Sequence, residues 1–204
     1  MEPLWLQWAK QIQAISQAGL AYSKDIYDLE RFEMLRTLSV DILKRYTDAE
    51  SERIRELFAS ETGYATPKVD VRGVVFEGDK ILLVQERLDG AWSLPGGWAD
   101  IGLSPKEVAV KEVREESGLD VKPVRLLGIL DKKFHGHPPS PWHIYKIFIL
   151  CESIGGRMGA GMETLQVGLF ERDQLPELSA QRNTKAQIER MFELRDLPGE
   201  VLCD

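Results

Sequence analysis

Two patterns of hydrophobic and polar positions meet near residue 65. Residues 1–65 contain almost no Gly or Pro, and their apolar side chains recur every three or four residues, as on one face of a helix. From Lys68 the apolar positions form short runs rich in Val and Ile, which are typical of strands. The pattern predicts a helical N-terminal domain at 1–65 and a second domain, containing strands, at 66–204.

The N-terminal domain is expected to contain three helices. Their apolar positions are Leu4, Trp8, Ile12 and Ile15 in the first, Ile26, Leu29, Phe32, Leu35, Leu38 and Ile42 in the second, and Ile54, Leu57 and Phe58 in a third after Asp48. Helices of this size bury too little apolar surface to be stable alone. We therefore expect them to pack on the rest of the chain, on a second copy in a homodimer, or on both. Trp5 and Trp8 are expected in the core or the subunit interface, with stacking on a substrate as the alternative.

The second domain is expected to be an α/β sandwich in which a mixed sheet lies between helices. Strand-like runs stand at 68–77, 80–87, 92–94, 124–130, 143–150 and 165–170. The first two runs meet at Gly78, which is a hairpin signal. Ser104 with Glu107, and Thr184 with Gln187, fit capping boxes and predict that a helix begins after each.

The first of these helices carries a cluster of acidic residues. It is predicted over 105–117, because Gly118 is suited to end it. Glu112, Glu115 and Glu116 are spaced at i, i+3 and i+4, so their carboxylates share one face and repel one another. Such a face is either solvated or neutralised by a bound divalent cation, and Mg²⁺ prefers hard oxygen ligands of this kind.

The segment from Gly96 to Leu119, GGWADIGLSPKEVAVKEVREESGL, resembles the Nudix box of nucleoside diphosphate hydrolases. The positions that match its spacing are Gly97, Glu112, Val113, Glu115, Glu116, Gly118 and Leu119. Leu103 stands where the box has its first Glu, and Lys111 replaces its Arg. Asp100 offers either a compensating polar contact or turn chemistry. The whole chain resembles the branch with a helical N-terminal domain, in which both replacements are familiar.

This resemblance implies a Nudix-type α/β/α sandwich at 66–204 and a hydrolase for nucleoside diphosphates linked to another group, X. The implied products are nucleoside monophosphate and phosphorylated X. CDP-choline is the first candidate substrate, followed by ADP-ribose and nucleotide sugars. Mg²⁺ is the expected cofactor, with Mn²⁺ as a substitute. RNA 5′ or 3′ ends are an alternative substrate, and a nucleotide-binding regulator without catalysis is an alternative role.

The resemblance also implies which residues bind metal and catalyse the reaction. The implied metal ligands are the backbone carbonyl of Gly96 and the carboxylates of Glu112, Glu115 and Glu116. The base that deprotonates the attacking water is Glu116, Glu115 or Glu163, unless two metal ions lower the pKa of the water enough without one. Glu163 is alternatively a solvated loop residue.

Three further residues are candidates for substrate contacts. Arg72 lies in a predicted strand near the acidic helix, and Arg87 follows the next strand. Both are suited either to bind a phosphate or to form an ion pair. Trp98 follows the glycine turn, where it would stack on a base, contact a quaternary ammonium group, or pack against the acidic helix.

The charge and the remaining composition indicate which partners, metals and cellular compartment to expect. The chain of 204 residues has a formal net charge of -7, which argues against a main role in binding nucleic acid backbones. Cys151 and Cys203 lack metal-ligand spacing and are expected to stay reduced. His135, His137 and His143 are expected to support loop structure and substrate contacts rather than zinc. Because no apolar run approaches roughly 20 residues and no signal peptide pattern is present, we expect a cytoplasmic protein that is not in a membrane.

Overall fold

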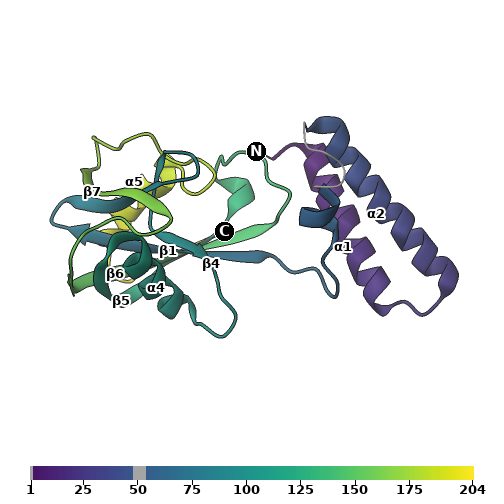
Figure 1. Ribbon diagram of the computed structural model, residues 1–204, viewed down its shortest axis with the longest axis horizontal. Helices are drawn as coiled ribbons and strands as arrows, with labels where there is room; N and C mark the ends of the chain where they lie inside the picture. The colour runs from purple at the N-terminus through teal and green to yellow at the C-terminus, as the bar shows by residue number, and fades with distance from the viewer. Residues whose placement is uncertain (1, 48–53) are drawn as a thin grey trace. The chain divides into compact units, whose positions relative to one another are not determined.

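The computed structural model describes residues 2–47 and 54–204 (Figure 1). The chain divides into two compact units. Residues 1–67 with 139–143 form the first, called here the helical unit, and residues 68–138 with 144–204 form the second, called the sheet unit. Each unit has hydrophobic core residues of its own.

In the helical unit, α1 (Leu4–Tyr22) and α2 (Ile26–Tyr46) lie side by side as a hairpin. Asp25 caps α2, because its side chain accepts hydrogen bonds from the backbone N–H groups two and three residues later. The first two predicted helices are confirmed. The third prediction falls partly on residues 48–53, outside the described residues. The part of it that the structure describes contains one π-helical turn, η1 (Arg55–Ala59).

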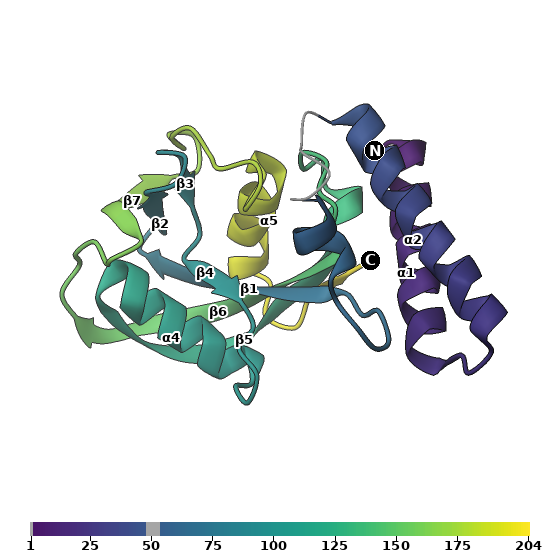
Figure 2. The same ribbon diagram turned by 45° about the vertical axis from the view of Figure 1, so that its right-hand side comes forward.

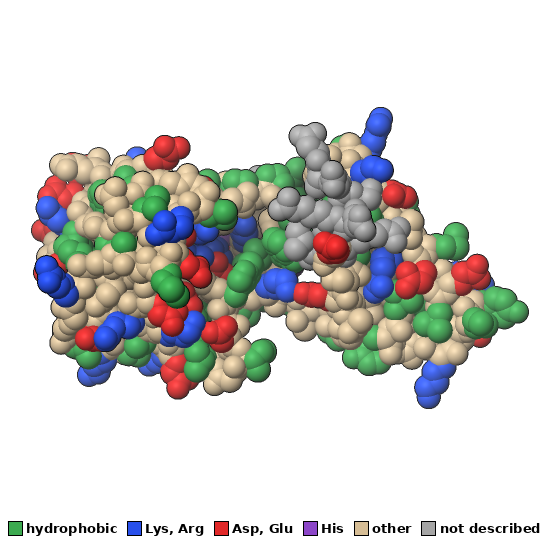
Figure 3. All heavy atoms as spheres, viewed as in Figure 1, with side chains coloured by type: hydrophobic (Ala, Val, Ile, Leu, Met, Phe, Trp, Pro, Cys, Tyr) green, Lys and Arg blue, Asp and Glu red, His purple; other side chains and the backbone are tan. Residues whose placement is uncertain are grey.

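The buried face of α1 is not its apolar stripe. Leu6 and Ala9 are buried in the core of the helical unit, next to polar side chains on the same face. Leu4, Trp8 and Ile15, three of the four residues of the stripe, are 63%, 56% and 58% exposed, and the fourth, Ile12, is half-buried. Hydrophobic side chains are visible on the surface of this unit in Figure 3. The stripe therefore takes no part in the core of the single chain.

The sheet unit is built on a mixed sheet, as predicted. Its strands are β1 (Lys68–Glu77), β2 (Lys80–Glu86), β3 (Trp92–Ser93), β4 (Gly96–Trp98), β5 (Leu119–Asp131), β6 (Ile144–Gly156), β7 (Thr164–Glu171) and β8 (Leu202–Cys203). They run in the order β3-β2-β1-β6-β5-β8, with β4 paired to β1 and β7 paired to β2. The pairs β1–β6 and β5–β8 are parallel, and the other pairs are antiparallel. The short strands β4 and β8 were not predicted, and β5 and β6 extend beyond the predicted runs 124–130 and 143–150.

The two helices of the sheet unit cover opposite faces of the sheet (Figure 2). Val113 of α4 (Pro105–Ser117) belongs to one hydrophobic core, and Met191 of α5 (Lys185–Arg195) belongs to the other. Both predicted capping boxes are formed, and a short 3-10 helix, η2 (Lys132–Phe134), follows β5. The predicted α/β/α sandwich is confirmed. Within the described part of the chain, no helix has the length and apolar character that a membrane span requires.

Candidate functional site

The site is organised by Gly96 and Gly97, which begin β4 after a bend at Pro95 and are called here the glycine turn. Gly96 has a φ of 148°, and a Cβ there would collide with the carbonyl oxygen of Val71 on β1. Glycine therefore allows β4 to pair closely with β1. At Gly97 an added Cβ would lie 3.3 Å from Oε2 of Glu112. The turn thus leaves room for a carboxylate from α4.

Glu116 on α4 is held against this turn. Its Oε2 accepts a hydrogen bond from the N–H of Gly96 at 2.9 Å, and the residue is only 8% exposed. The pKa of Glu116 is raised to about 8, first by burial and then by the charges of Glu86 and Glu112, while the Gly96 N–H and the Arg72 guanidinium act in the opposite direction. A cation bound beside Glu116 would offset this concentrated negative charge.

Relative to Glu116→Gln, the metal-free wild-type protein is expected to lose stability as the pH rises from about 4.5 to about 8. In this window Glu116 keeps its proton in the folded state and has released it in the unfolded chain, so its contribution to the free energy of unfolding falls with pH. His137, whose pKa burial lowers to about 4, contributes in the opposite direction in both proteins. Thermal unfolding in EDTA across this range measures the effect. Glu116→Gln removes this titrating group, so the wild type should lose stability relative to the variant across the window; a wild-type profile parallel to that of Glu116→Gln would contradict the raised pKa.

Lys111 binds the other two glutamates of the acidic face. Its Nζ lies 3.3 Å from Glu112, 3.2 Å from Glu115 and 3.2 Å from Asp100. Both roles considered for Asp100 are present: its carboxylate contacts Lys111, and its backbone carbonyl accepts the N–H of Leu103 at 3.3 Å in a turn. The side chain of Glu115 is 59% exposed, and Figure 3 shows acidic and basic side chains mixed on the face that carries α4. The face is therefore divided: Glu116 is bonded to Gly96, Glu115 is paired with Lys111, and Glu112 lies beside Gly97 and also contacts Lys111.

The three glutamates do not form a ready-made metal site. In residues 2–47 and 54–204, no three His, Cys, Asp or Glu side chains converge in a way that could hold a metal ion. The donors at the turn nevertheless fit a hard divalent cation, because Glu112 and Glu116 present carboxylate oxygens there and burial penalises the charge of Glu116. The ligand roles of Gly96, Glu112, Glu115 and Glu116 stay predictions.

Arg72 lies inside the sheet unit and is 3% exposed. Its Nε and Nη2 both donate to the Asp70 carboxylate at 2.8 Å, and its Nη1 donates to the carbonyl of Leu94 at 3.0 Å. Lys146 on β6 adds a second cation, 3.0 Å from Asp70. Burial alone would raise the pKa of Asp70, but Arg72 and Lys146 together hold it well below its usual range. Arg72 therefore forms a buried ion pair, and phosphate binding by it stays a prediction.

The loop before β7 is attached to the end of α4. Thr164 Oγ1 donates to the backbone carbonyl of Glu116 at 2.9 Å. Arg87 donates to the carbonyls of Met162 and Thr164, each at 3.1 Å, and its backbone N–H donates to the carbonyl of Glu163 at 3.0 Å. The loop thus brings the exposed Glu163 into the neighbourhood of Glu116, while the Arg87 side chain contacts backbone. The catalytic role of Glu163 and the substrate role of Arg87 stay predictions.

Trp98 lies at the end of β4, whereas His135 and His137 lie in the loop after η2. Trp98 ends β4 and is 48% exposed, so its predicted contact with substrate also stays a prediction. His135 Nε2 lies 2.8 Å from Oδ2 of Asp204, whereas His137 Nδ1 lies 2.7 Å from the carbonyl of Ala180. These two histidines therefore contact different partners.

Two residues at the site, Glu86 and Arg182, were not predicted from the sequence. Glu86, at the end of β2, is 5% exposed; it accepts a hydrogen bond from Ser93 Oγ at 2.6 Å and forms an ion pair with Arg182 Nε at 2.9 Å. Strand alternation could have placed Glu86 inside with Val84, because they share a face. No local signal indicates that Arg182, far along the chain, is its partner.

Family models built from known proteins match both parts of the chain. A family model described as "NUDIX domain" matches residues 66–192, and one described as "UDP-X-like, N-terminal oligomerisation domain" matches residues 3–58. The Bacillus subtilis protein named "Putative ADP-ribose pyrophosphatase YjhB" is 51% identical over 196 residues, which cover 96% of this chain and 94% of that protein.

Two solved structures are also similar. A UDP-X diphosphatase is 34% identical with a TM-score of 0.65, and the match covers 98% of both chains. An ADP-ribose pyrophosphatase from Streptococcus suis is 45% identical with a TM-score of 0.63, covering 68% of this chain and 100% of that one. The similarity therefore extends over both the helical unit and the sheet unit.

Proposed function

Since the chain belongs to the NUDIX family, we propose that it is a magnesium-dependent pyrophosphatase for X-linked nucleoside diphosphates, which releases nucleoside monophosphate and phosphorylated X. The observation that carries the proposal is the position of Glu116. It is 8% exposed, bonded to the N–H of Gly96 and close to Glu112. A merely solvated acidic face would leave this side chain in water.

The residues at the turn have distinct parts in this proposal. Magnesium bound there would neutralise charge on the pyrophosphate oxygens and lower the pKa of the attacking water. Glu112 and Glu116 would hold it, and the N–H of Gly96 fixes the orientation of the Glu116 carboxylate. Glu163 is a candidate base because its loop is bonded to the end of α4 through Thr164.

The choice of X rests on the relatives. The sequence favoured CDP-choline, followed by ADP-ribose and nucleotide sugars. The names of the Bacillus subtilis and Streptococcus suis relatives favour ADP-ribose, and that of the UDP-X diphosphatase favours uridine nucleotides. We therefore rank ADP-ribose first among the substrates to be tested and retain CDP-choline.

The test is to incubate the purified protein and Mg²⁺ with ADP-ribose, CDP-choline, UDP-sugars and RNA, and to identify products by chromatography. We expect a nucleoside monophosphate and phosphorylated X from at least one nucleoside diphosphate derivative. Cleavage of RNA alone, with a steep salt dependence, would replace the proposed substrate class. Binding without turnover would indicate a nucleotide-binding regulator and overturn the hydrolase proposal.

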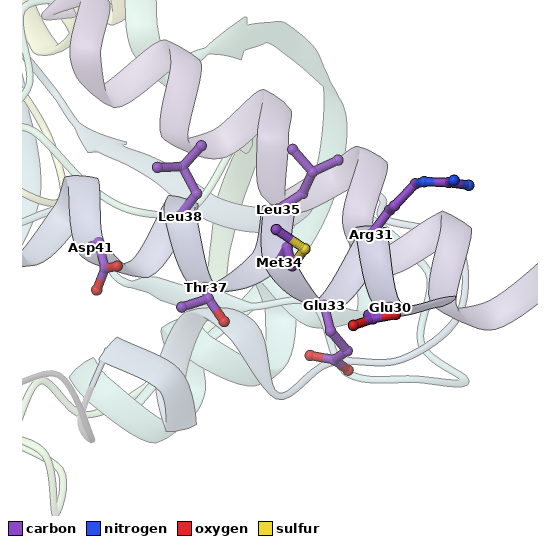
Figure 4. A pocket seen from close by; sticks show the side chains of 8 residues that line it. All are labelled: Glu30, Arg31, Glu33, Met34, Leu35, Thr37, Leu38 and Asp41. Atoms are coloured by element: carbon purple, nitrogen blue, oxygen red, sulfur yellow. The ribbon is translucent and has the colours of Figure 1, made fainter. Parts of the chain in front are cut away.

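We also propose that the helical unit mediates a homodimer. Large apolar side chains are exposed on both helices, among them Trp8 on α1 and Met34 and Leu38 on α2. Met34 and Leu38 line an open groove of about 810 Å³ along α2 (Figure 4). The match of residues 3–58 to an N-terminal oligomerisation domain supports a second copy as the partner of this surface.

The double substitution Met34→Glu with Leu38→Glu is expected to give a monomer. Two charges would be buried without partners if the second copy covered this groove. Light scattering at micromolar concentration should report a dimer mass for the wild type and a monomer mass for the double variant. Ile154→Glu is the matched control, because Ile154 is 65% exposed on the sheet unit. A strictly monomeric wild type would contradict the proposal.

A further inference from the structure

The segment Glu177–Asn183 lies along β3, the strand that leads into the glycine turn. Trp92 N–H donates to the carbonyl of Glu177 at 2.9 Å, and Ser179 N–H donates to the carbonyl of Trp92 at 2.8 Å. A parallel bridge joins Trp92 to Leu178. Since β3 has only two residues and its other edge pairs with β2, this segment supplies the missing hydrogen bonds of the strand.

Asn183 extends this pairing to the start of the turn. The residue is 0% exposed, and its Oδ1 accepts the N–H of Leu94 at 3.0 Å. The carbonyl of the same Leu94 accepts a hydrogen bond from Arg72, and two residues later the N–H of Gly96 binds Glu116. Asn183 and Arg72 therefore fix Leu94 through its two backbone groups, next to the point where Glu116 is held.

Arg182 pairs with Glu86, a second carboxylate, whose charge acts on Glu116. Its Nε lies 2.9 Å from Oε1 of Glu86, and its Nη1 lies 3.2 Å from Oδ2 of Asp89. Ser93, the residue before Leu94, donates to the same Oε1 of Glu86 at 2.6 Å. Glu86 is 5% exposed. If Arg182 were replaced, neighbouring protein groups rather than water would therefore have to respond to the unpaired Glu86 carboxylate.

We propose that Arg182 and Asn183 are positioning residues, which act through Glu86 and Leu94 to fix the carboxylate of Glu116. The inference rests on the proposed pyrophosphatase function. It assigns Arg182 and Asn183 a role in the reaction in addition to their contribution to the fold. A displacement of about 1 Å at a reacting group is enough to lower a rate by about 100-fold.

The test is a double-mutant cycle with Arg182→Gln and Glu86→Gln. We expect Arg182→Gln to lower kcat by about 10- to 100-fold, with KM for the nucleotide changed by less than about twofold. Mn²⁺ binding to the metal-free protein, followed by electron spin resonance, should weaken in parallel. Because Arg182 acts through Glu86, the kcat of the double variant should be no lower than that of the less active of the two single variants.

Two further variants separate positioning from stability. Arg182→Lys keeps the charge beside Glu86 and should restore part of the lost kcat; it also serves as the test if Arg182→Gln does not fold. Asn183→Ala, which removes the acceptor of the Leu94 N–H, should lower kcat with the same small effect on KM. Arg172→Gln is the matched control, because Arg172 forms a comparable ion pair with Glu193 at 2.9 Å with both side chains exposed.

The proposal is overturned if the folded Arg182 variants keep wild-type kcat and Mn²⁺ affinity and lose only thermal stability, because that result describes a structural contact. It is likewise overturned if the losses of Arg182→Gln and Glu86→Gln are fully additive. Failure of the proposed function gives a different result: the wild type then cleaves no substrate. The Mn²⁺ affinities of the same variants still decide the positioning role in that case.

Discussion

Glu116→Gln is expected to lower kcat by about 10²- to 10⁴-fold while leaving the fold intact. Gln has the same shape, and its side-chain oxygen still accepts the N–H of Gly96, which lies 2.9 Å from the carboxylate in the wild type. It carries no charge to hold a cation and cannot take a proton from water. Turnover of the best substrate at saturating Mg²⁺, together with the melting temperature of the variant, measures both parts of the expectation.

Glu189→Gln provides the control for this experiment. Glu189 lies on α5, where it pairs with Lys185 at 3.8 Å and both side chains are partly exposed, so its loss should leave turnover unchanged. The turnover of Glu115→Gln should lie between those of Glu116→Gln and Glu189→Gln, because Glu115 shares the acidic face but is paired with Lys111. Near-normal turnover of Glu116→Gln would remove Glu116 from the catalytic centre.

The parts of the fold that could be predicted are those specified by neighbouring residues. The bounds predicted for α4, 105–117, are those observed, because a capping box opens the helix and Gly118, with a φ of 74°, ends it. The hairpin of β1 and β2 forms across Gly78 for the same reason. Each signal acts within a few positions, so no tertiary contact is needed to interpret it.

The partners within the site could not be predicted, because they are set by contacts between distant segments. The sequence gives no reason for Arg72 to select Asp70 rather than a phosphate, or for Arg182 to select Glu86; both choices depend on which strands and loops the fold brings together. The single face of the acidic helix shows the same limit. Helical spacing placed Glu115 with Glu116 but did not indicate that Glu115 pairs with Lys111 while Glu116 binds the N–H of Gly96.

The buried faces of the helical unit show a different limit. The hydrophobic stripe of α1 was a correct sign of a helix and gave no information about which partner covers it. Leu6 and Ala9, which are buried, lie on a face shared with polar residues, whereas Trp8 is 56% exposed. Periodicity reports that an apolar face exists. It does not distinguish the core of one chain from an interface between two.

Asp70→Asn is expected to lower the free energy of unfolding by about 3 to 5 kcal/mol, because it removes a carboxylate that pairs with two buried cations. Arg72 is 3% exposed and Lys146 is 1% exposed, and both contact the Asp70 carboxylate. Urea unfolding at neutral pH measures the loss. Asp79→Asn is the control: Asp79 pairs with Arg195 at 3.3 Å, but its side chain is 94% exposed, so the change should stay below about 1 kcal/mol.

The pH dependence of Asp70→Asn identifies which cation is responsible. Burial already lowers the pKa of Lys146 to about 8 in the wild type, although Asp70 opposes this. Without that carboxylate the pKa falls further, so folded Lys146 loses its proton below pH 8 while the unfolded chain keeps it, and stability rises with pH. The deficit of the variant should therefore shrink as the pH approaches 8. Adding Lys146→Met should recover part of it at every pH, whereas a deficit that neither treatment changes would assign the whole loss to Arg72.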